Sequence, residues 1–166
     1  MINKFSLDHQ SKNYLVISSD IESRYMMVIT KVSEYFDKSV EKILENPDVM
    51  YVSLPVIDKS GNITSTLSNY ELQMREYGLL DKLDTNRIGN EITIDQIRDV
   101  ISFTQISAHK NKKVVILNSA SNMNKEASSA LLKTLEEVSS NCTFIFLASS
   151  LNSIAETIKS RCQVLQ

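Results

Sequence analysis

The sequence contains only two cysteines, Cys142 and Cys162, and two widely separated histidines, His9 and His109. Two cysteines cannot build a disulfide framework, and no recognisable ligand spacing surrounds either histidine, so we expect no metal site. Both cysteines lie in or beside apolar runs, where cysteine usually behaves as a small buried hydrophobe. We therefore expect reduced thiols in a cytoplasmic protein.

Long apolar runs and an excess of positive charge are also missing. No stretch approaches the roughly 20 apolar residues of a membrane-spanning helix, and the first residues lack the apolar core and cleavage site of a secretory signal. The net charge is −2 and the pI is about 5.7, whereas a domain that holds DNA by phosphate contacts alone normally carries a basic excess. We expect no membrane contact, and contact with DNA only indirectly, through a larger assembly.

The apolar residues that are present predict strands alternating with helices. A chain of 166 residues suits one domain, since a single core commonly spans roughly 100–200 residues. Short apolar runs predict strands at residues 13–18, 48–54, 114–117, 143–147 and 162–165. Helix-period stripes predict helices directly after the first strand, at 94–106, at 125–137 and around 154–158. This alternation predicts an α/β fold with a parallel sheet covered on both faces.

Two of these helices allow more specific predictions. Asn124 is a plausible N-cap for the helix over 125–137. The positions 94, 97, 100, 101 and 104–106, most of them apolar, suit one face of the helix that begins at Ile94.

Residues 58–92 are the least regular part of the sequence. Residues 58–62 read Asp-Lys-Ser-Gly-Asn, which is a turn signal. A short helix over 71–80 is the only further element that we predict in this range. We interpret residues 58–92 as a surface insertion.

Two segments near the C-terminus carry a resemblance to a known family. Residues 130–137 read Ala-Leu-Leu-Lys-Thr-Leu-Glu-Glu, and residues 157–163 read Thr-Ile-Lys-Ser-Arg-Cys-Gln after an intervening apolar strand. At that spacing they resemble bacterial clamp-loader subunits of DNA polymerase III, which belong to the AAA+ ATPase superfamily. The resemblance implies a P-loop NTPase-like three-layer sandwich with five parallel strands in the order 5-1-4-3-2. The family's lid and collar domains have no counterpart in residues 1–166, which we expect to form a single core domain.

The turn after the first strand departs from a working phosphate loop. Such a loop has the form G-x-x-x-x-G-K-[ST], because glycines let backbone N–H groups approach the phosphates, the lysine neutralises charge and the hydroxyl holds magnesium. This chain fills the two glycine positions, the lysine position and the hydroxyl position with Ser18, Ser23, Arg24 and Tyr25. Asp20 and Glu22 would add negative charge beside a triphosphate. We therefore expect no nucleotide site and no cofactor.

The acidic motif after the third strand is degenerate as well. ATP hydrolysis with magnesium uses an aspartate for the metal and a glutamate to orient water. The family has Asp-Glu-Ala-Asp where this chain has Asn118, Ser119, Ala120 and Ser121. The loss of two motifs makes the chain most similar to the delta-prime branch, whose members sit in the ring without hydrolysing ATP. Ser149 and Ser150 stand where the family usually places a polar sensor, although serines that close a strand are more often turn residues.

The motif that contains Arg161, in contrast, is intact. In the family, the arginine of the Ser-Arg-Cys tripeptide is an arginine finger directed at the ATP of the neighbouring subunit. The resemblance assigns this role to Arg161, with Ser160 positioning the turn and Cys162 packing against the sheet. The alternative is a surface arginine paired with a carboxylate such as Glu156.

Lys133 and the zinc module of the family complete the comparison. Lys133 could face the channel of the ring and meet DNA, but an exposed lysine beside Glu136 or Glu137 is the simpler interpretation. Many delta-prime chains carry a four-cysteine zinc module between the first helix and the second strand. Residues 35–49 contain no cysteine, so we expect no zinc.

Together these features predict a non-catalytic clamp-loader subunit of the replicative DNA polymerase III. It would act as a stator in the ring and offer Arg161 to an adjacent ATP. Its expected partners are the ATP-hydrolysing clamp-loader subunits and a delta-type subunit. Two alternatives remain: a divergent active nucleotide hydrolase that uses Arg24 in place of lysine, and a free-standing pseudo-ATPase interaction domain outside replication.

Overall fold

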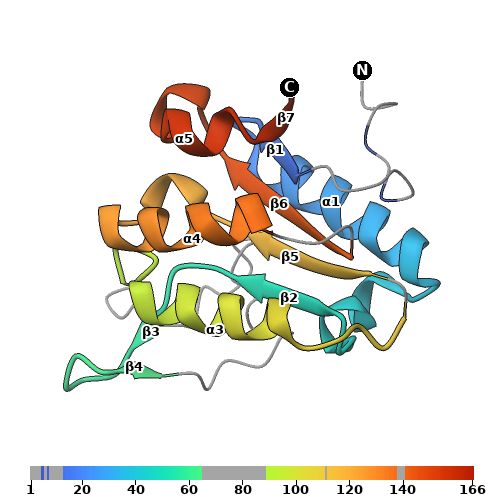
Figure 1. Ribbon diagram of the computed structural model, residues 1–166, viewed down its shortest axis with the longest axis horizontal. Coiled ribbons are helices and arrows are strands. Elements are labelled where there is room, and N and C mark those ends of the chain that lie inside the picture. Colours follow the sequence, from blue (N-terminus) through green and yellow to red (C-terminus); the bar gives the residue numbers. More distant parts are fainter. Residues whose placement is uncertain (1–4, 6, 8–12, 65–88, 111, 138–140) are drawn as a thin grey trace.

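The computed structural model describes residues 5, 7, 13–64, 89–110, 112–137 and 141–166 (Figure 1). Its helices are α1 (Ile21–Phe36), α3 (Ile94–Gln105), α4 (Lys125–Glu137) and α5 (Glu156–Lys159), joined by the 3₁₀ turns η1 (Val40–Glu45), η3 (Ala120–Asn122) and η4 (Leu151–Ser153). Its strands are β1 (Asn13–Ile17), β2 (Val49–Val52), β3 (Val56–Ile57), β4 (Ile63–Thr64), β5 (Lys113–Leu117), β6 (Cys142–Ala148) and β7 (Cys162–Leu165). The helix predicted over residues 71–80 lies outside the described residues.

Five strands form one parallel sheet in the order β2-β5-β6-β1-β7. Numbered in chain order among themselves, these strands are 2-3-4-1-5, which is the predicted order 5-1-4-3-2 read from the other edge. Every residue of β5 and β6 is buried, as expected for strands covered on both faces. The predicted fold class is therefore confirmed.

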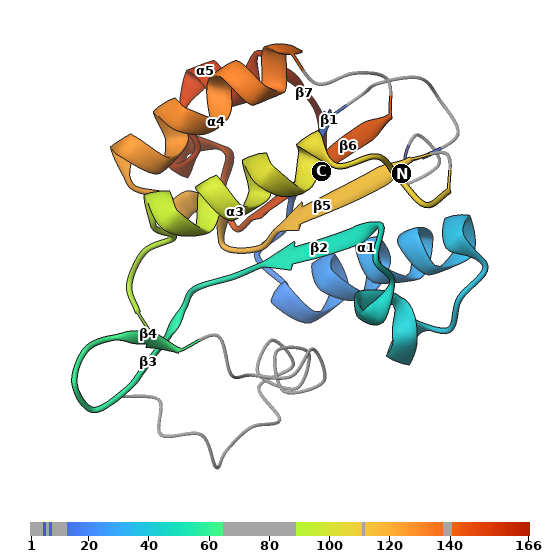
Figure 2. The ribbon, with the colours of Figure 1, turned by 60° about the horizontal axis from the view of Figure 1, so that its bottom comes forward.

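The sheet separates two hydrophobic cores, which gives the molecule three layers (Figure 2). Helix α1 and η1 cover one face, whereas α3 and α4 cover the other. Alternate residues of β1 enter opposite cores, with Leu15 on the α3–α4 side and Tyr14 and Val16 on the α1 side. This is the period-2 alternation of a strand. None of the helices in the described ranges is long and apolar enough to cross a membrane.

Helix α3 begins with a capping box formed by Thr93 and Gln96. The Thr93 hydroxyl accepts a hydrogen bond from the Gln96 N–H (3.5 Å), and the Gln96 side chain accepts one from the Thr93 N–H (3.1 Å). The Gln96 amide also donates to the main-chain oxygen of Ser53 (2.9 Å), which ties α3 to the end of β2. The prediction that Ile106 continues the buried face is wrong, because the helix ends at Gln105 and Ile106 is 63% exposed.

The segment predicted as an insertion starts inside a two-stranded antiparallel hairpin, because β3 ends just before residue 58 and β4 lies within the segment. This hairpin was not predicted. Its turn matches the Asp58–Asn62 signal: the Asp58 carboxylate accepts the N–H groups of Ser60 (2.8 Å) and Asn62 (2.9 Å). The range 58–92 is too wide as a surface insertion, because Ile92 is fully buried in the main core.

The chain returns to the core through Gly89, which lies against Pro55. The Gly89 N–H donates to the main-chain oxygen of Pro55 (2.8 Å). A methyl group on Gly89 would lie 2.8 Å from the Pro55 ring and 3.2 Å from Ile57. This close approach of two backbone segments explains why glycine occupies the position.

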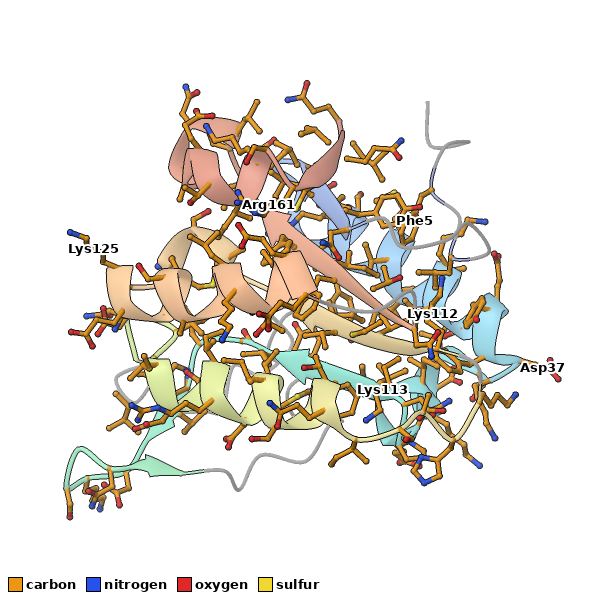
Figure 3. The ribbon with its side chains drawn as sticks, in the orientation of Figure 1. Phe5, Asp37, Lys112, Lys113, Lys125 and Arg161 are labelled. Carbon is orange, nitrogen blue, oxygen red and sulfur yellow. The ribbon has the colours of Figure 1, made fainter. Side chains whose placement is uncertain are left out.

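Charged side chains are buried at the amino-terminal edge of the sheet. The Asp48 side chain is 1% exposed, and its carboxylate accepts the N–H groups of His109 and Lys110, both at 2.7 Å. Lys112 and Lys113 extend to opposite faces (Figure 3): Lys112 donates to the Leu7 carbonyl, and Lys113 donates to a carbonyl at the end of α3, each at 2.6 Å. Each buried charge thus meets backbone partners, as buried charges require.

Candidate functional site

The degenerate motifs meet at one edge of the sheet, where the parallel strands end. Strands β1 and β5 flank β6, with Ile17 opposite Ala148 and Leu117 opposite Phe146. Ser18 and Asn118 follow the last residues of β1 and β5, so the fold brings the two motifs to the same edge. In open α/β sheets this is the edge where ligands bind.

The start of α1 is closed by its own side chains. Asp20 is the N-cap, and its carboxylate accepts the Ser23 N–H (3.1 Å) and the Ser23 hydroxyl (2.7 Å). The Asp20 N–H donates to the Ser18 hydroxyl (3.1 Å). A phosphate-binding helix directs its first N–H groups and its positive dipole end at the anion. Here a carboxylate occupies that place. The side chain of Glu22 lies outside the described side chains.

Arg24 and Tyr25 are both buried. Arg24 is buried and donates a hydrogen bond to the main-chain oxygen of Ser18. Tyr25 is 1% exposed within the core beneath α1, where its ring meets Tyr51 edge-on at 5.9 Å. Its hydroxyl therefore does not stand where a phosphate loop holds magnesium.

A small hollow of about 240 Å³ lies beside this turn. It is lined by Val16, Ile17, Ser18, Ser23, Arg24, Met27, Leu165 and Gln166. Among these described lining residues Arg24 is the one with a charged side chain, and its guanidinium donates a hydrogen bond to the main chain.

Asn118 and Ser119 take structural positions at the end of β5. Asn118 is 1% exposed, and its N–H donates to the main-chain oxygen of Val52 (2.8 Å). Ser119 has a left-handed backbone with φ of 56° and accepts the Asn122 N–H (2.8 Å) as η3 begins. Neither residue carries the negative charge that magnesium would require.

Ser150, the second of the two serines after β6, is a turn residue. Ser150 caps η4, its hydroxyl accepting the Asn152 N–H (3.3 Å). Ser153 bonds both the Ser150 carbonyl (2.7 Å) and the hydroxyl of Ser121 (2.8 Å), which joins η3 to η4. The interpretation of these serines as turn residues is therefore confirmed for Ser150.

Arg161 lies between α4 and the α5–β7 turn (Figure 3). One terminal nitrogen donates to the Thr157 carbonyl (2.8 Å) and the Ser160 hydroxyl (3.2 Å). The other donates to the carboxylate of Glu136, near the end of α4. Glu156, the partner that we named from the sequence, instead pairs with Lys159 (2.6 Å).

Arg161 stands at the opposite edge of the sheet from the turn between β1 and α1 (the phosphate turn, residues 18–25) of its own chain. It precedes Cys162, which pairs with Asn13 at the start of β1, whereas Ser18 follows the end of β1. At about 3.3 Å per residue, a five-residue strand separates the two edges by roughly 15 Å. Arg161 and the degenerate motifs therefore cannot act on one phosphate.

The remaining predicted residues have local partners. Ser160 ends α5 and donates to the Thr157 carbonyl (3.1 Å). Lys133 is 79% exposed and lies 3.8 Å from Glu137. Asn124 caps α4 by accepting the Ala127 N–H (2.8 Å), which confirms that prediction.

Both cysteines are free thiols in apolar surroundings. Burial raises the pKa of Cys142 and of Cys162 to about 12. Within the described part of the chain, His, Cys, Asp and Glu side chains form no group of three or more that could hold a metal ion.

Comparison with known families shows which family the chain belongs to. The family described as DNA polymerase III, delta subunit, matches residues 72–166, which is more than half of the chain. The chain belongs to this family. The match includes α3, α4 and the Ser160–Cys162 turn, so the delta-subunit assignment covers Arg161 but not the phosphate turn.

Individual relatives support the delta-subunit assignment. The chain is 43% identical to the DNA polymerase III subunit delta′ of Haemophilus influenzae over 77 residues, which are 46% of this chain and 24% of the relative. It is 37% identical to the delta′ subunit of Pseudomonas aeruginosa over 81 residues, or 48% of this chain and 25% of the relative. Replication factor C subunit 5 of Neurospora crassa is 27% identical over 139 residues, 84% of this chain and 38% of the relative. The chain thus aligns with about a quarter of each delta′ relative.

Solved structures agree on the fold. A DNA polymerase III gamma subunit-related protein of Thermotoga maritima superposes with a TM-score of 0.65 at 19% identity, covering 96% of this chain and 42% of that one. The RuvB Holliday junction branch migration motor of the same organism gives 0.52 at 8% identity, covering 92% and 36%. This delta-family chain therefore has the AAA+ P-loop NTPase core fold.

The sequence did not identify Glu136 as the partner of Arg161. Glu136 and Glu137 are adjacent in the Leu-Leu-Lys-Thr-Leu-Glu-Glu segment, and the sequence does not show which of them contacts Arg161. Only the packing of α4 beside α5 selects Glu136.

Proposed function

We propose that this chain is a non-catalytic, delta-prime-like clamp-loader subunit of a cytoplasmic DNA polymerase III, a stator that offers Arg161 to the ATP of a neighbouring subunit. Its partners would be the ATP-hydrolysing subunits and a delta-type subunit, with DNA met only through the assembly. The observation that carries the proposal is the placement of Arg161. The Ser160–Cys162 tripeptide is intact at one edge of the sheet, while the turn at the other edge is closed by Asp20 and Arg24.

The chemistry of phosphoryl transfer explains how one motif can persist without the other. An arginine finger stabilises charge that develops on the transferred phosphoryl group and needs no nucleotide site in its own subunit. A guanidinium is suited to this because it is always charged and can bond phosphate through two N–H groups at once. If this chain supplies only Arg161, ATP hydrolysis in the ring does not require a nucleotide site at its degenerate turn.

The test is Arg161→Ala in the complete chain, assembled with the ATP-hydrolysing subunits. At the site that Arg161 serves, we expect hydrolysis to slow by about 10³-fold or more, as for other arginine fingers. Arg98→Ala is the matched control, because Arg98 is also a helix-associated arginine paired with a carboxylate, Asp95, at 2.6 Å. Equal rates for the unmodified and Arg161→Ala complexes, with assembly intact, would overturn the proposal.

A further inference from the structure

Arg161 is held by three acceptors before any phosphate arrives. The Thr157 carbonyl and the Ser160 hydroxyl lie on one terminal nitrogen, and the Glu136 carboxylate lies on the other. The first two acceptors belong to the same turn as Arg161, but Glu136 lies 25 residues earlier on a different helix. Glu136 is therefore the contact that fixes the side chain relative to the rest of the fold.

The Glu136–Arg161 contact is poorly suited to stabilising the fold. The Glu136 side chain is 54% exposed and that of Arg161 is 32% exposed. Water screens ion pairs at such exposure, and most of them contribute little to stability. What the contact does provide is order, since an unrestrained arginine side chain has considerable rotamer freedom.

The contacts also leave the guanidinium able to bind phosphate. A guanidinium has five N–H donors, and the three contacts from the described residues use three of them. Two donors are enough for a bidentate bond to phosphate. Arg161 can thus engage a phosphate while Glu136 still holds it.

We propose that Glu136 is a positioning residue that pre-orients Arg161 toward the triphosphate of the neighbouring subunit. This inference rests on the proposed function of Arg161. Donors that are already oriented stabilise a transition state without reorganising during the reaction. Glu136 should therefore affect the rate of the chemical step more than the affinity for ATP.

Neighbouring residues supply matched variants. Glu137 is the next residue of α4, is 66% exposed and pairs with Lys133 rather than with Arg161. Glu137→Ala removes a comparable exposed carboxylate from the same helix. Glu136→Gln keeps an oxygen that can accept the Arg161 hydrogen bond, so it separates loss of the contact from loss of the charge.

The experiment measures ATP turnover of the assembled clamp loader carrying Glu136→Ala, Glu136→Gln, Glu137→Ala or Arg161→Ala, and the double variant of Glu136 and Arg161. For Glu136→Ala we expect kcat to fall about two- to tenfold, which corresponds to a modest coupling between contacting residues, with KM nearly unchanged. Glu136→Gln should retain most of the rate, and Glu137→Ala should retain all of it. In the Arg161→Ala background, Glu136→Ala should have no further effect.

The outcomes separate the two proposals. Suppose that Arg161→Ala slows turnover while Glu136→Ala leaves it unchanged or accelerates it. The positioning role of Glu136 is then overturned, and the arginine-finger role of Arg161 stands. A complex in which Arg161→Ala has no effect overturns both. Additive losses from Glu136→Ala and Arg161→Ala would also overturn the positioning role, because each residue would then act independently. Thermal unfolding of each variant chain checks that the fold is intact.

Discussion

The guanidinium of Arg24 donates a hydrogen bond to the main-chain oxygen of Ser18, six residues earlier. This bond closes the turn between β1 and α1 from inside the same chain. Asp20 closes it from the other side by accepting two hydrogen bonds from Ser23. The turn keeps the strand-to-helix geometry of its fold, but its own side chains accept the N–H groups of Asp20 and Ser23.

The closed turn predicts that the isolated chain does not bind Mg-ATP. The carboxylate of Asp20 repels a triphosphate, and Arg24 would have to leave Ser18 to reach one. Isothermal titration with Mg-ATP should give no binding in the micromolar range. An ATP-hydrolysing clamp-loader subunit, titrated under the same conditions, is the positive control. Micromolar binding by this chain would favour the alternative of a divergent nucleotide hydrolase.

Asp48 predicts a dependence of stability on acid. Burial opposes ionisation of this carboxyl, but hydrogen bonds from the backbone of His109 and Lys110, and from the His109 ring, outweigh it and hold the pKa of Asp48 below its usual value. A carboxyl with a lowered pKa contributes stability above its unfolded pKa, about 3.9, and that contribution is lost as the pH falls through the folded value. Asp48→Asn should therefore destabilise the chain at pH 7, and the loss should shrink as the pH falls from 7 towards 3 and below.

Urea unfolding at several pH values between these limits tests that expectation. At pH 7 the loss should be about 1–3 kcal/mol, the cost of removing one partner of a buried hydrogen-bond set. Asp95→Asn is the control, because Asp95 is 76% exposed and pairs with Arg98 on the surface of α3. A loss for Asp48→Asn that stays the same from pH 7 to pH 3 would show that the charge of Asp48 is unimportant.

Gly89→Ala should destabilise the point where the chain re-enters the core. The added methyl group would lie 2.8 Å from the stiff ring of Pro55, and such overpacking typically costs about 1–3 kcal/mol. The lower backbone entropy of alanine in the unfolded chain offsets less than about 1 kcal/mol of this. The midpoint of thermal unfolding should fall.

Adding Pro55→Ala tests the cause of that loss. Removal of the ring relieves the overlap, so the double variant should be more stable than the sum of the two single losses predicts. Strictly additive losses would mean that contact with Pro55 is not the reason for glycine at position 89.

Most of the sheet was predictable because each strand is encoded locally. The β-branched and apolar runs that form β1, β5 and β6 are buried on both faces. Their short length, β-branched composition and flanking turn residues distinguish such runs from helices. The hairpin β3–β4 escaped prediction because its paired strands are two residues long, too short for any periodicity to be seen. The strand order came from the family resemblance, since a local pattern does not state which strands are neighbours.

The candidate site, like the sheet, was predictable from the sequence only in part. The sequence alone determined that the phosphate loop and the acidic motif lack their catalytic side chains, because that chemistry depends on residue type. It also placed Arg161 in an intact Ser-Arg-Cys tripeptide. Only the tertiary structure decided that Tyr25 turns into the core and that Glu136, rather than Glu156, holds Arg161. These outcomes depend on how helices pack against the sheet and against each other, which brings together residues that are far apart in the chain.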